Sequence, residues 1–432
     1  MSCISGIGVK ADNEWHLLSN EAKKFIESTD EFLDEGVNPG GYYKAVWCRD
    51  ASYILKDWFL AGRFEHVMQE ILYIWSHQIN AGGEKIIYGR GSPEANYLSQ
   101  VARPEAQKKF EGALPTTIFH GFSEVYGRDP DIDSTALMVS TTAWVFESCL
   151  KAGLAFPSSF QSASESQELA VSSVVSNPET AIEFVVPKML RAVEFLAGRD
   201  VDGDGLLEQG HNEDWMDTVL RKGKIVYSQA CWIIALENLS SLTSELCMEG
   251  ESVRLAAMAG RARDAVEQRL WSEQDGTYVD LHDESPYTVL TQDVALYLIA
   301  ATENNRAATD RAKCTLDTIK SRIWKDRWPL VTESALKKTG PWVLHPNQYH
   351  NHTFWPWITG IEMLARSRHG RIDECQTLFS MLASSDSQSR VRAFYEWVNP
   401  VTNQGSGAYP FRTGISTIRI ALLDMLNRLA VE

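Results

Sequence analysis

The spacing of apolar residues predicts helices along most of the chain. The C-terminal segment is the clearest case, because its apolar side chains recur every three or four residues and therefore share one helical face. These side chains are Ile415, Ile418, Leu422, Met425, Leu426 and Leu429. The same spacing predicts further helices near residues 19–34, 51–63, 65–79, 135–153, 181–198, 225–240, 251–271, 288–303, 307–322, 354–367 and 371–384.

These roughly twelve helices come without a convincing series of alternating strands and without a close internal repeat. They fit a double ring of helices, an all-α (α/α)6 barrel. We expect a single domain over residues 1–432, because the two segments that break the rhythm do not resemble domain boundaries. Residues 80–132 show little periodicity, and a loop of that length is usually functional or disordered. Residues 156–178 are rich in serine and are expected to form a mobile surface excursion.

Composition narrows the class of protein. The chain has 432 residues, of which 44% are hydrophobic and 23% charged, as in an ordinary globular protein. A net charge of -16 argues against a nucleic-acid partner and fits a neutral substrate. We find neither a signal peptide nor an apolar run long enough for a membrane span. Seven dispersed cysteines without a Cys-x-x-Cys pair suggest reduced thiols and a cytoplasmic location. The sequence does not predict the oligomeric state.

Three carboxylates surround one tryptophan in the segment 212–217. Glu213, Asp214 and Asp217 flank Trp215, between a turn rich in Gly and Asp and an apolar run that is typical of a helix. Like charges and apolar surroundings both raise the pKa of a buried carboxyl. A carboxyl that stays protonated near neutral pH can act as a general acid. A solvated acidic turn that begins a helix is the alternative interpretation.

A second cluster of charged and aromatic residues precedes the helix predicted at 51–63. Arg49 and Asp50 can make the directional, charge-assisted hydrogen bonds that sugar hydroxyls require. Trp47 and the neighbouring tyrosines offer an apolar platform for a sugar face. Asp50 also stands where a helix N-cap is expected, a common structural role for aspartate. Asp133 likewise precedes a predicted helix. It is expected either to cap that helix or to reach the pocket.

A third cluster combines aromatic and polar residues within 348–358. Tyr349, His350 and Asn351 precede Trp355, and two indoles flank a proline at the start of a predicted helix. Core packing is the alternative, because tryptophan is usually buried. His350 and His352 form a His-x-His pair, but without a third ligand in view we expect no metal.

The last candidates lie in two turn-rich segments. Glu396 stands between aromatic residues, ahead of a Gly-rich loop that contains Tyr409 and leads into the final helix. The turn 200–204 resembles the start of a calcium loop, but His211 stands where an EF-hand has its bidentate glutamate. We interpret it as a turn with a modest chance of binding calcium, and we expect no cofactor.

These segments together carry a family resemblance, from about residue 40 to the end. The chain resembles the six-fold double-ring glycosidases that include glucoamylases and the glucosidase domain of glycogen debranching enzymes. Residues 46–51 resemble the glucoamylase segment in which an Arg-Asp pair holds the terminal glucose. Residues 214–217, 349–351 and 355–357 resemble the Trp-Met-Asp, Tyr-His-Asn and Trp-Pro segments of the debranching domain. His352 replaces a glycine of that pattern, which would narrow the pocket.

The resemblance implies inverting hydrolysis by an exo-acting glycosidase. Asp217 would protonate the glycosidic oxygen, and Glu396, where the clan keeps its base, would deprotonate a water on the opposite face of the sugar. An α-linked oligosaccharide or small glucoside is the expected substrate, with glucose as the released sugar. The substrate-binding residues would be Trp47, Arg49, Asp50, Asp133, Glu213, Asp214, Trp215, Tyr349, His350, Asn351, Trp355 and Tyr409.

Two other classes of function stay open at this stage. The same double ring of helices hosts sugar epimerases and polysaccharide lyases, so the fold alone does not decide the reaction. His350 and His352 suit an epimerase, whereas the net charge of -16 counts against a lyase, which needs a basic cleft. A non-catalytic carbohydrate-binding protein is the second alternative, and the presence of both Asp217 and Glu396 speaks against it.

Overall fold

The structure is a computed structural model. It describes residues 19–80, 86–88, 109–120, 122–125, 129–154, 178–282, 285–286, 289–301, 306–325, 328–337 and 344–429. The Ser-rich excursion predicted at 156–178 lies outside these residues except for its last position, and so does much of the predicted loop 80–132.

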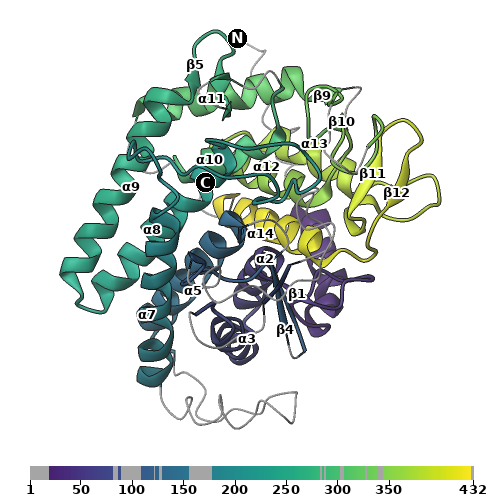
Figure 1. Ribbon diagram of the computed structural model, residues 1–432. Coiled ribbons are helices and arrows are strands. Elements are labelled where there is room, and N and C mark those ends of the chain that lie inside the picture. Colours follow the sequence, from purple (N-terminus) through teal and green to yellow (C-terminus); the bar gives the residue numbers. More distant parts are fainter. Residues whose placement is uncertain are drawn as a thin grey trace, which may run out of the picture.

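Helices dominate the described residues (Figure 1). Residues 19–28 are helical and lead into the 3-10 helix η1 (Asp30–Asp34). The further α-helices are α2 (Cys48–Leu60), α3 (Phe64–Ser76), α5 (Ile132–Ala152), α7 (Pro178–Ala197), α8 (Val226–Glu245), α9 (Glu249–Arg269), α10 (Ala295–Ala300), α11 (Arg306–Arg322), α12 (Pro356–Arg368), α13 (Ile372–Ala383) and α14 (Arg412–Leu429). The helix predicted at 288–303 is shorter, and consists of the 3-10 helix η2 (Gln292–Val294) followed by α10.

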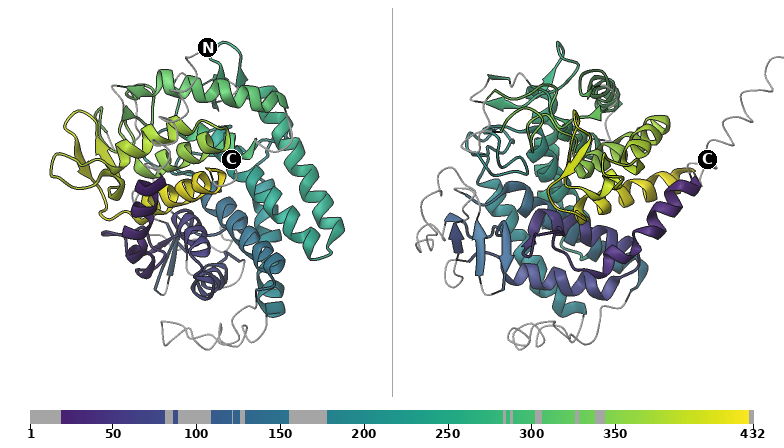
Figure 2. Two further views of the ribbon diagram at one scale, coloured as in Figure 1. Left: turned by 180° about the vertical axis from the view of Figure 1, so that it is seen from behind. Right: turned by 90° about the vertical axis from the view of Figure 1, so that its right-hand side faces the viewer.

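Six of the described helices form a closed inner ring. α2 packs against α5, α5 against α8, α8 against α10, α10 against α12, α12 against α14, and α14 again against α2. The helices that follow them in the chain, α3, α7, α9, α11 and α13, lie outside, as Figures 1 and 2 show most clearly for α9 and α11. The predicted all-α double ring is therefore confirmed.

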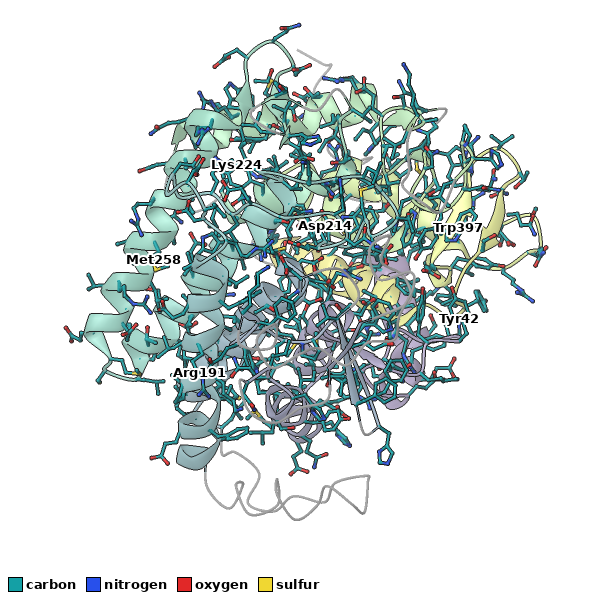
Figure 3. All side chains as sticks on the ribbon, in the orientation of Figure 1. Tyr42, Arg191, Asp214, Lys224, Met258 and Trp397 are labelled. Atoms are coloured by element: carbon teal, nitrogen blue, oxygen red, sulfur yellow. The ribbon has the colours of Figure 1, made fainter. Side chains whose placement is uncertain are left out.

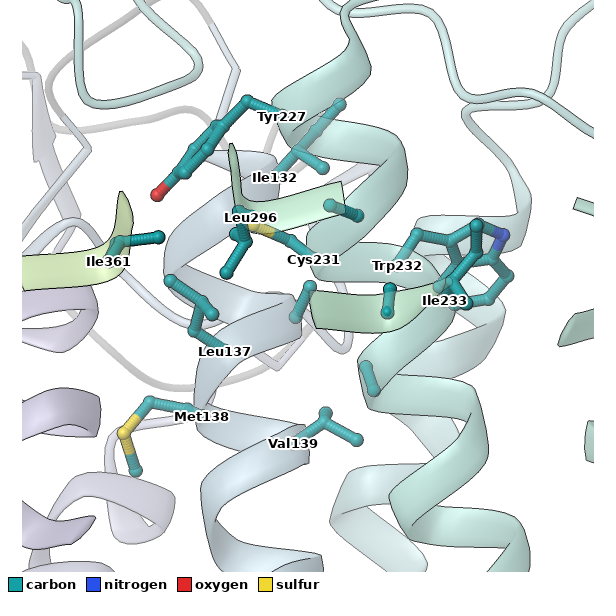
Figure 4. Close-up of a cluster of buried hydrophobic side chains, with 14 of the residues drawn as sticks. Ile132, Leu137, Met138, Val139, Tyr227, Cys231, Trp232, Ile233, Leu296 and Ile361 are labelled. Carbon is teal, nitrogen blue, oxygen red and sulfur yellow. The ribbon is translucent and has the colours of Figure 1, made fainter. Parts of the chain in front are cut away.

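Burial explains which helices take the inner positions. α5 and α8 are buried around most of their circumference, as expected of helices covered on every side. α9 instead buries a single stripe, which lies against α8. The contact between α5 and α8 is built from side chains such as Ile132, Val139, Tyr227 and Ile233 (Figure 4). Among the described helices, none combines the length and apolar character that a bilayer crossing requires.

A small sheet was not predicted from the sequence. β1 (Val46–Trp47), β3 (Thr117–Phe119), β4 (Phe122–Val125) and β2 (Ile86–Tyr88) lie side by side in that order. β1 pairs antiparallel with β3, with Val46 opposite Ile118. Strands of two to four residues are too short to show an alternating pattern, which explains why no strand was expected there. β1 leads directly into α2 and thereby fixes the start of that helix.

Four two-stranded ribbons complete the described structure. They connect or flank the helices and consist of β5 (Trp271–Ser272) with β6 (Thr277–Tyr278), β7 (Leu281–His282) with β8 (Ser285–Pro286), β9 (Trp324–Lys325) with β10 (Trp328–Pro329), and β11 (Trp397–Asn399) with β12 (Gln404–Ser406). The last ribbon follows the 3-10 helix η4 (Arg392–Phe394) and precedes α14.

Candidate active site

A pocket with about 440 Å3 of empty space opens at one end of the inner ring. Its walls come from the N-terminal ends of α2, α12 and α14 and from the segments that precede α8, α12 and α14. The lining residues are Pro39, Tyr43, Trp47, Arg49, Asp50, Trp215, Asp217, Tyr349, His350, Trp355, Trp357, Glu396, Phe411 and Thr413.

Asp217 lies on the loop that leads into α8. Its side chain is 22% exposed, and its buried Oδ1 atom has no hydrogen-bond partner among the described residues. Burial raises the pKa of Asp217 to about 7, and the negative charges of Glu396, Asp214 and Asp133 add to this effect, whereas Arg49 opposes it. A carboxyl with this pKa is largely protonated below neutral pH, as a general acid requires.

The loop that carries Asp217 is anchored by a buried arginine. Arg221 is 3% exposed and pairs with Asp214 at 3.2 Å, Asp280 at 3.1 Å and Asp293 at 2.6 Å. Asp280 also accepts the backbone N–H of Val226 at the start of α8, at 2.8 Å. Because one guanidinium joins three carboxylates from different segments, it fixes this loop against η2 and α8.

Glu396 begins the segment that forms the β11–β12 ribbon, and it is 1% exposed. Its Oε1 atom accepts hydrogen bonds from Tyr43 at 2.8 Å and Tyr349 at 3.3 Å. Its Oε2 atom accepts from Tyr42 at 3.0 Å and from the backbone N–H of Ala408 at 2.7 Å. Burial raises the pKa of Glu396, but these four donors favour the carboxylate and oppose that rise.

Arg49 and Asp50 form the polar end of the pocket. Asp50 is 5% exposed and accepts a hydrogen bond from Thr413 Oγ1 at 2.6 Å, which joins the N-terminal ends of α2 and α14. Arg49 Nη1 lies 3.3 Å from Asp133 Oδ2, and Arg49 Nε lies 3.7 Å from Asp50 Oδ2. The guanidinium is therefore fixed between two carboxylates.

Aromatic rings enclose the remaining walls. The Trp215 indole meets His350, Trp355 and Trp357 edge to face, with ring centroids 5.1 to 5.5 Å apart. The Nε1 atom of Trp215 donates to Asp293 Oδ2 at 2.8 Å, so the indole is held in place. Burial lowers the pKa of His350 well below its usual range, and the imidazole is therefore neutral. Aromatic faces with a few fixed polar groups are the kind of surface that small-molecule sites present.

The structure places several predicted substrate-binding residues outside the pocket lining. Glu213 is buried and pairs with Arg199, and it accepts the Gly210 backbone N–H at 2.8 Å. Asp214 is held by Arg221, and Figure 3 shows it near the middle of the molecule. Asp133 is fully buried and pairs with Arg49. Each of these carboxylates is therefore engaged in holding the site rather than exposed in it.

Two further predicted residues have structural roles. The side chain of Asn351 is fully buried and donates to the carbonyl groups of Leu336 at 3.3 Å and Leu344 at 3.1 Å. Tyr409 is 37% exposed and packs against Tyr395, with ring centroids 4.7 Å apart. Neither residue lines the pocket.

The predicted capping roles of Asp50 and Asp133 are corrected. α2 begins at Cys48 and α5 at Ile132, so Asp50 and Asp133 lie in the first helical turn, and Trp47 and Asp131 occupy the N-cap positions. A carboxylate in the first turn still interacts favourably with the positive end of the helix dipole.

The predicted narrowing of the pocket by His352 is also corrected. His352 contacts the carbonyl oxygen of Thr332 at 2.8 Å and does not line the pocket. His350 and His352 therefore have different surroundings, and neither belongs to the one potential metal cluster found among the described residues.

That cluster consists of Asp200, Asp202 and Glu208, in the predicted calcium-like turn. The Lys224 ammonium group lies against it, 2.6 Å from Asp202 and from Asp204 and 3.3 Å from Glu208. Because the ammonium group already supplies a positive charge to these carboxylates, the residues present do not favour a calcium ion here.

Several lining residues are absent from the predicted set of substrate-binding residues, although Tyr43 is one of the tyrosines expected beside Trp47 as an apolar platform. They are Pro39, Tyr43, Trp357, Phe411 and Thr413. Trp357 and Tyr43 belong to segments that the sequence singled out, so proximity to a candidate was an available signal. Pro39 carries no side chain chemistry that would have distinguished it.

The comparisons with known proteins bear on the fold. No protein-family model matches the sequence, and no curated protein sequence matches it either. Solved structures do match. The GH63 mannosylglycerate hydrolase from Thermus thermophilus, in complex with Tris and D-glycerate, is 16% identical with a TM-score of 0.60, and the match covers 93% of this chain and 99% of that one.

Two further structures show the same likeness. A rhamnosidase from Klebsiella oxytoca with rhamnose bound is 13% identical with a TM-score of 0.56, covering 95% of this chain and 63% of that chain. A structure described as a wild-type glycosidase is 13% identical with a TM-score of 0.59, covering 96% of this chain and 98% of that chain. The structural neighbours are thus glycoside hydrolases, and the predicted resemblance to the double-ring glycosidases is confirmed for the fold that this chain shares with them.

Proposed function

We propose that the protein is an inverting, exo-acting glycoside hydrolase that releases a terminal sugar, with glucose as our first choice. The observation that carries this proposal is the pairing of two unlike carboxyl groups in one pocket. Burial raises the pKa of Asp217 to about 7, whereas four hydrogen-bond donors around Glu396 favour its charged form and oppose the rise that burial causes in its pKa. Two carboxyl groups with such different environments suit an acid and a base.

The proposed reaction consumes one water molecule. Asp217 donates its proton to the glycosidic oxygen as the bond between that oxygen and the anomeric carbon breaks. A water oxygen attacks the anomeric carbon from the opposite face and gives its proton to Glu396. The products are the free sugar with inverted configuration and the alcohol of the leaving group.

The remaining lining residues would bind the terminal sugar. Arg49 and Asp50 present charged hydrogen-bonding groups at the polar end of the pocket. Trp47, Trp215 and Trp355 offer aromatic faces for the ring carbons.

The substrate would be an α-linked oligosaccharide or a small glucoside. A structural neighbour of almost the same extent is a mannosylglycerate hydrolase, so small glycosides of that type belong in the screen beside maltooligosaccharides. The helices of the inner ring are spread along the chain from Cys48 to Leu429. We therefore propose that the chain acts as one catalytic domain. The described cysteines are all free, which supports a proposed cytoplasmic location.

The epimerase alternative gains no support from the site. Among the described residues, His350 is the single histidine in the pocket lining, and His352 contacts a backbone carbonyl instead. The described part of the pocket therefore does not present a pair of histidines to opposite sides of a sugar.

The test is hydrolysis of gluco-, manno- and rhamnosides by the purified protein and by two isosteric variants. Asp217→Asn and Glu396→Gln should each reduce kcat by about 10³-fold or more while thermal unfolding stays close to that of the wild type. Either variant with near-normal turnover would remove that residue from its role. Conversion of a free sugar without hydrolysis would favour an epimerase, and binding without any turnover would favour a carbohydrate-binding protein.

A further inference from the structure

Two consecutive residues contact the two proposed catalytic carboxyl groups. The hydroxyl group of Tyr349 donates to Glu396 Oε1 at 3.3 Å. The next residue, His350, places its Nδ1 atom 3.8 Å from Asp217 Oδ1. Asp217 and Glu396 belong to loops far apart in the sequence. Tyr349 and His350 are adjacent in the chain, so they link the immediate surroundings of these two carboxyl groups.

The backbone at this dipeptide has an uncommon conformation. Tyr349 has a φ of 47°, in the left-handed region that large L-residues rarely adopt. Such conformations persist where surrounding contacts enforce them, and they concentrate at functional sites. Here the carbonyl oxygen of Tyr349 accepts hydrogen bonds from Trp355 Nε1 at 3.0 Å and from Thr353 Oγ1. The buried side chain of Asn351, close by in the chain, fastens the same loop to Leu344.

The His350 ring is fixed on several sides. It stacks on Trp355 with centroids 4.7 Å apart and planes 26° from parallel, and the edge of Trp215 approaches it at 5.1 Å. Its Nδ1 atom lies 2.8 Å from Thr218 Oγ1, and Thr218 directly follows Asp217. The imidazole therefore forms a hydrogen bond with the loop that carries Asp217. It is also part of the buried wall beside the Asp217 carboxyl.

We propose that Tyr349 and His350 are positioning residues that fix the spacing of the proposed base and acid, Tyr349 acting on Glu396 and His350 on Asp217. This inference rests on the proposed hydrolase function. The left-handed turn at Tyr349 lets neighbouring side chains reach two different carboxyl groups. One rigid segment thus couples the placement of both groups, since Tyr349 donates to Glu396 and His350 lies beside Asp217.

The test is the pH dependence of kcat, because each residue should move a different limb of the profile. Tyr349→Phe removes one donor from the Glu396 carboxylate, so the pKa of the base should rise and the acid limb should move up by about half a pH unit. His350→Asn admits water beside Asp217, so the pKa of the acid should fall and the alkaline limb should move down by a similar amount.

Both variants should lower kcat about tenfold or more, and by a larger factor than they raise KM, because misplaced catalytic groups affect the transition state most. The charged and titratable groups around the two carboxyls stay unchanged in these variants. For Asp217 they are Arg49, Asp133, Asp214 and Glu396, and for Glu396 they are Asp217, Tyr42 and Tyr43.

Matched controls separate positioning from general effects on packing. Tyr278→Phe removes a tyrosine hydroxyl that donates to Glu267 at 2.7 Å in another part of the core, and it should leave both limbs in place. Thr218→Val removes the hydrogen-bond partner of His350 and should also move the alkaline limb alone. This variant tests the same contact if His350→Asn fails to fold.

The outcomes distinguish this inference from the function on which it rests. If the wild type is active but neither variant moves a limb of the pH profile, or both variants move the same limb, only the positioning roles are overturned. A wild type that releases no sugar from any glycoside overturns the proposed function and this inference with it.

Discussion

Gly407 is the residue that limits the space around the proposed base. It has a φ of 78°, and a Cβ atom added there would lie 2.3 Å from Glu396 Oε2. Ordinary van der Waals contact begins at 3.4 Å, so Gly407→Ala must displace the carboxylate by 3.4 − 2.3, about 1.1 Å. Such a shift breaks the 2.7 Å hydrogen bond from the Ala408 N–H and moves the base away from its water.

The expected result is a large loss of activity with a moderate loss of stability. A misplacement of about 1 Å costs on the order of 10² in kcat. The left-handed conformation costs an alanine about 1–2 kcal/mol, and the lost hydrogen bond to a charged group adds about 1.5–3 kcal/mol. We expect the free energy of unfolding to fall by roughly 2.5–5 kcal/mol, the sum of these two contributions.

Gly62→Ala is the matched control, because Gly62 has the same φ of 78° but no described atom within 4 Å of an added Cβ. It should lose only the conformational contribution of about 1–2 kcal/mol and keep its kcat. The assay compares sugar release and urea unfolding for both variants. If Gly407→Ala kept its kcat within twofold, or if both variants lost activity equally, the placement of Glu396 would not depend on Gly407 as argued.

Two further predictions concern the charges of the site. The wild-type pH profile should be bell-shaped: activity falls as pH rises through about 7, where Asp217 loses its proton, and falls again in acid as Glu396 gains one. A profile that stays flat from about pH 6 to 8 would contradict the role of Asp217. Arg221→Met leaves three buried carboxylates without their shared cation and should lower the free energy of unfolding by about 3–5 kcal/mol. A loss below about 1 kcal/mol in urea unfolding would mean that this arginine does not hold the loop.

The sequence predicts the helices well where their apolar pattern is long. The ranges predicted at 51–63, 181–198 and 371–384 correspond to α2, α7 and α13, with ends that differ by a few residues. Helix starts were placed too late where an aromatic or apolar residue begins the helix. α2 begins at Cys48, because the preceding Val46 and Trp47 pair with β3, and a two-residue strand leaves no pattern to detect.

The residues of the candidate site were predicted less well than the helices. Asp217 and Glu396 are predicted as candidates from their segments, and the structure brings both into one pocket lining. Glu213 and Asp214 are nearly indistinguishable from Asp217 in sequence, because neighbouring carboxylates carry the same charge and differ little in size. Only the fold shows that Glu213 pairs with Arg199 and Asp214 with Arg221, whereas the Asp217 carboxyl faces the pocket.

The hydrogen bonds that Tyr42 and Tyr43 make to Glu396 could not be predicted from the sequence, for a similar reason. Tyr42 and Tyr43 lie more than three hundred positions before Glu396, and their hydrogen bonds to it form only when α14 closes the ring against α2. Tyr409 lies in the Gly-rich loop that follows Glu396 in the chain, yet its side chain packs against Tyr395. Distance along the chain is therefore a poor guide to membership in this pocket.

The anomeric configuration of the first product tests the central claim most directly. Fresh hydrolysate of an α-glycoside can be followed by proton NMR before the released sugar equilibrates in solution. Asp217 as acid and Glu396 as base on opposite faces of one sugar predict that the β-anomer appears first. Initial release of the α-anomer would contradict this account, because it would require a nucleophile and a covalent intermediate in place of the water that Glu396 activates.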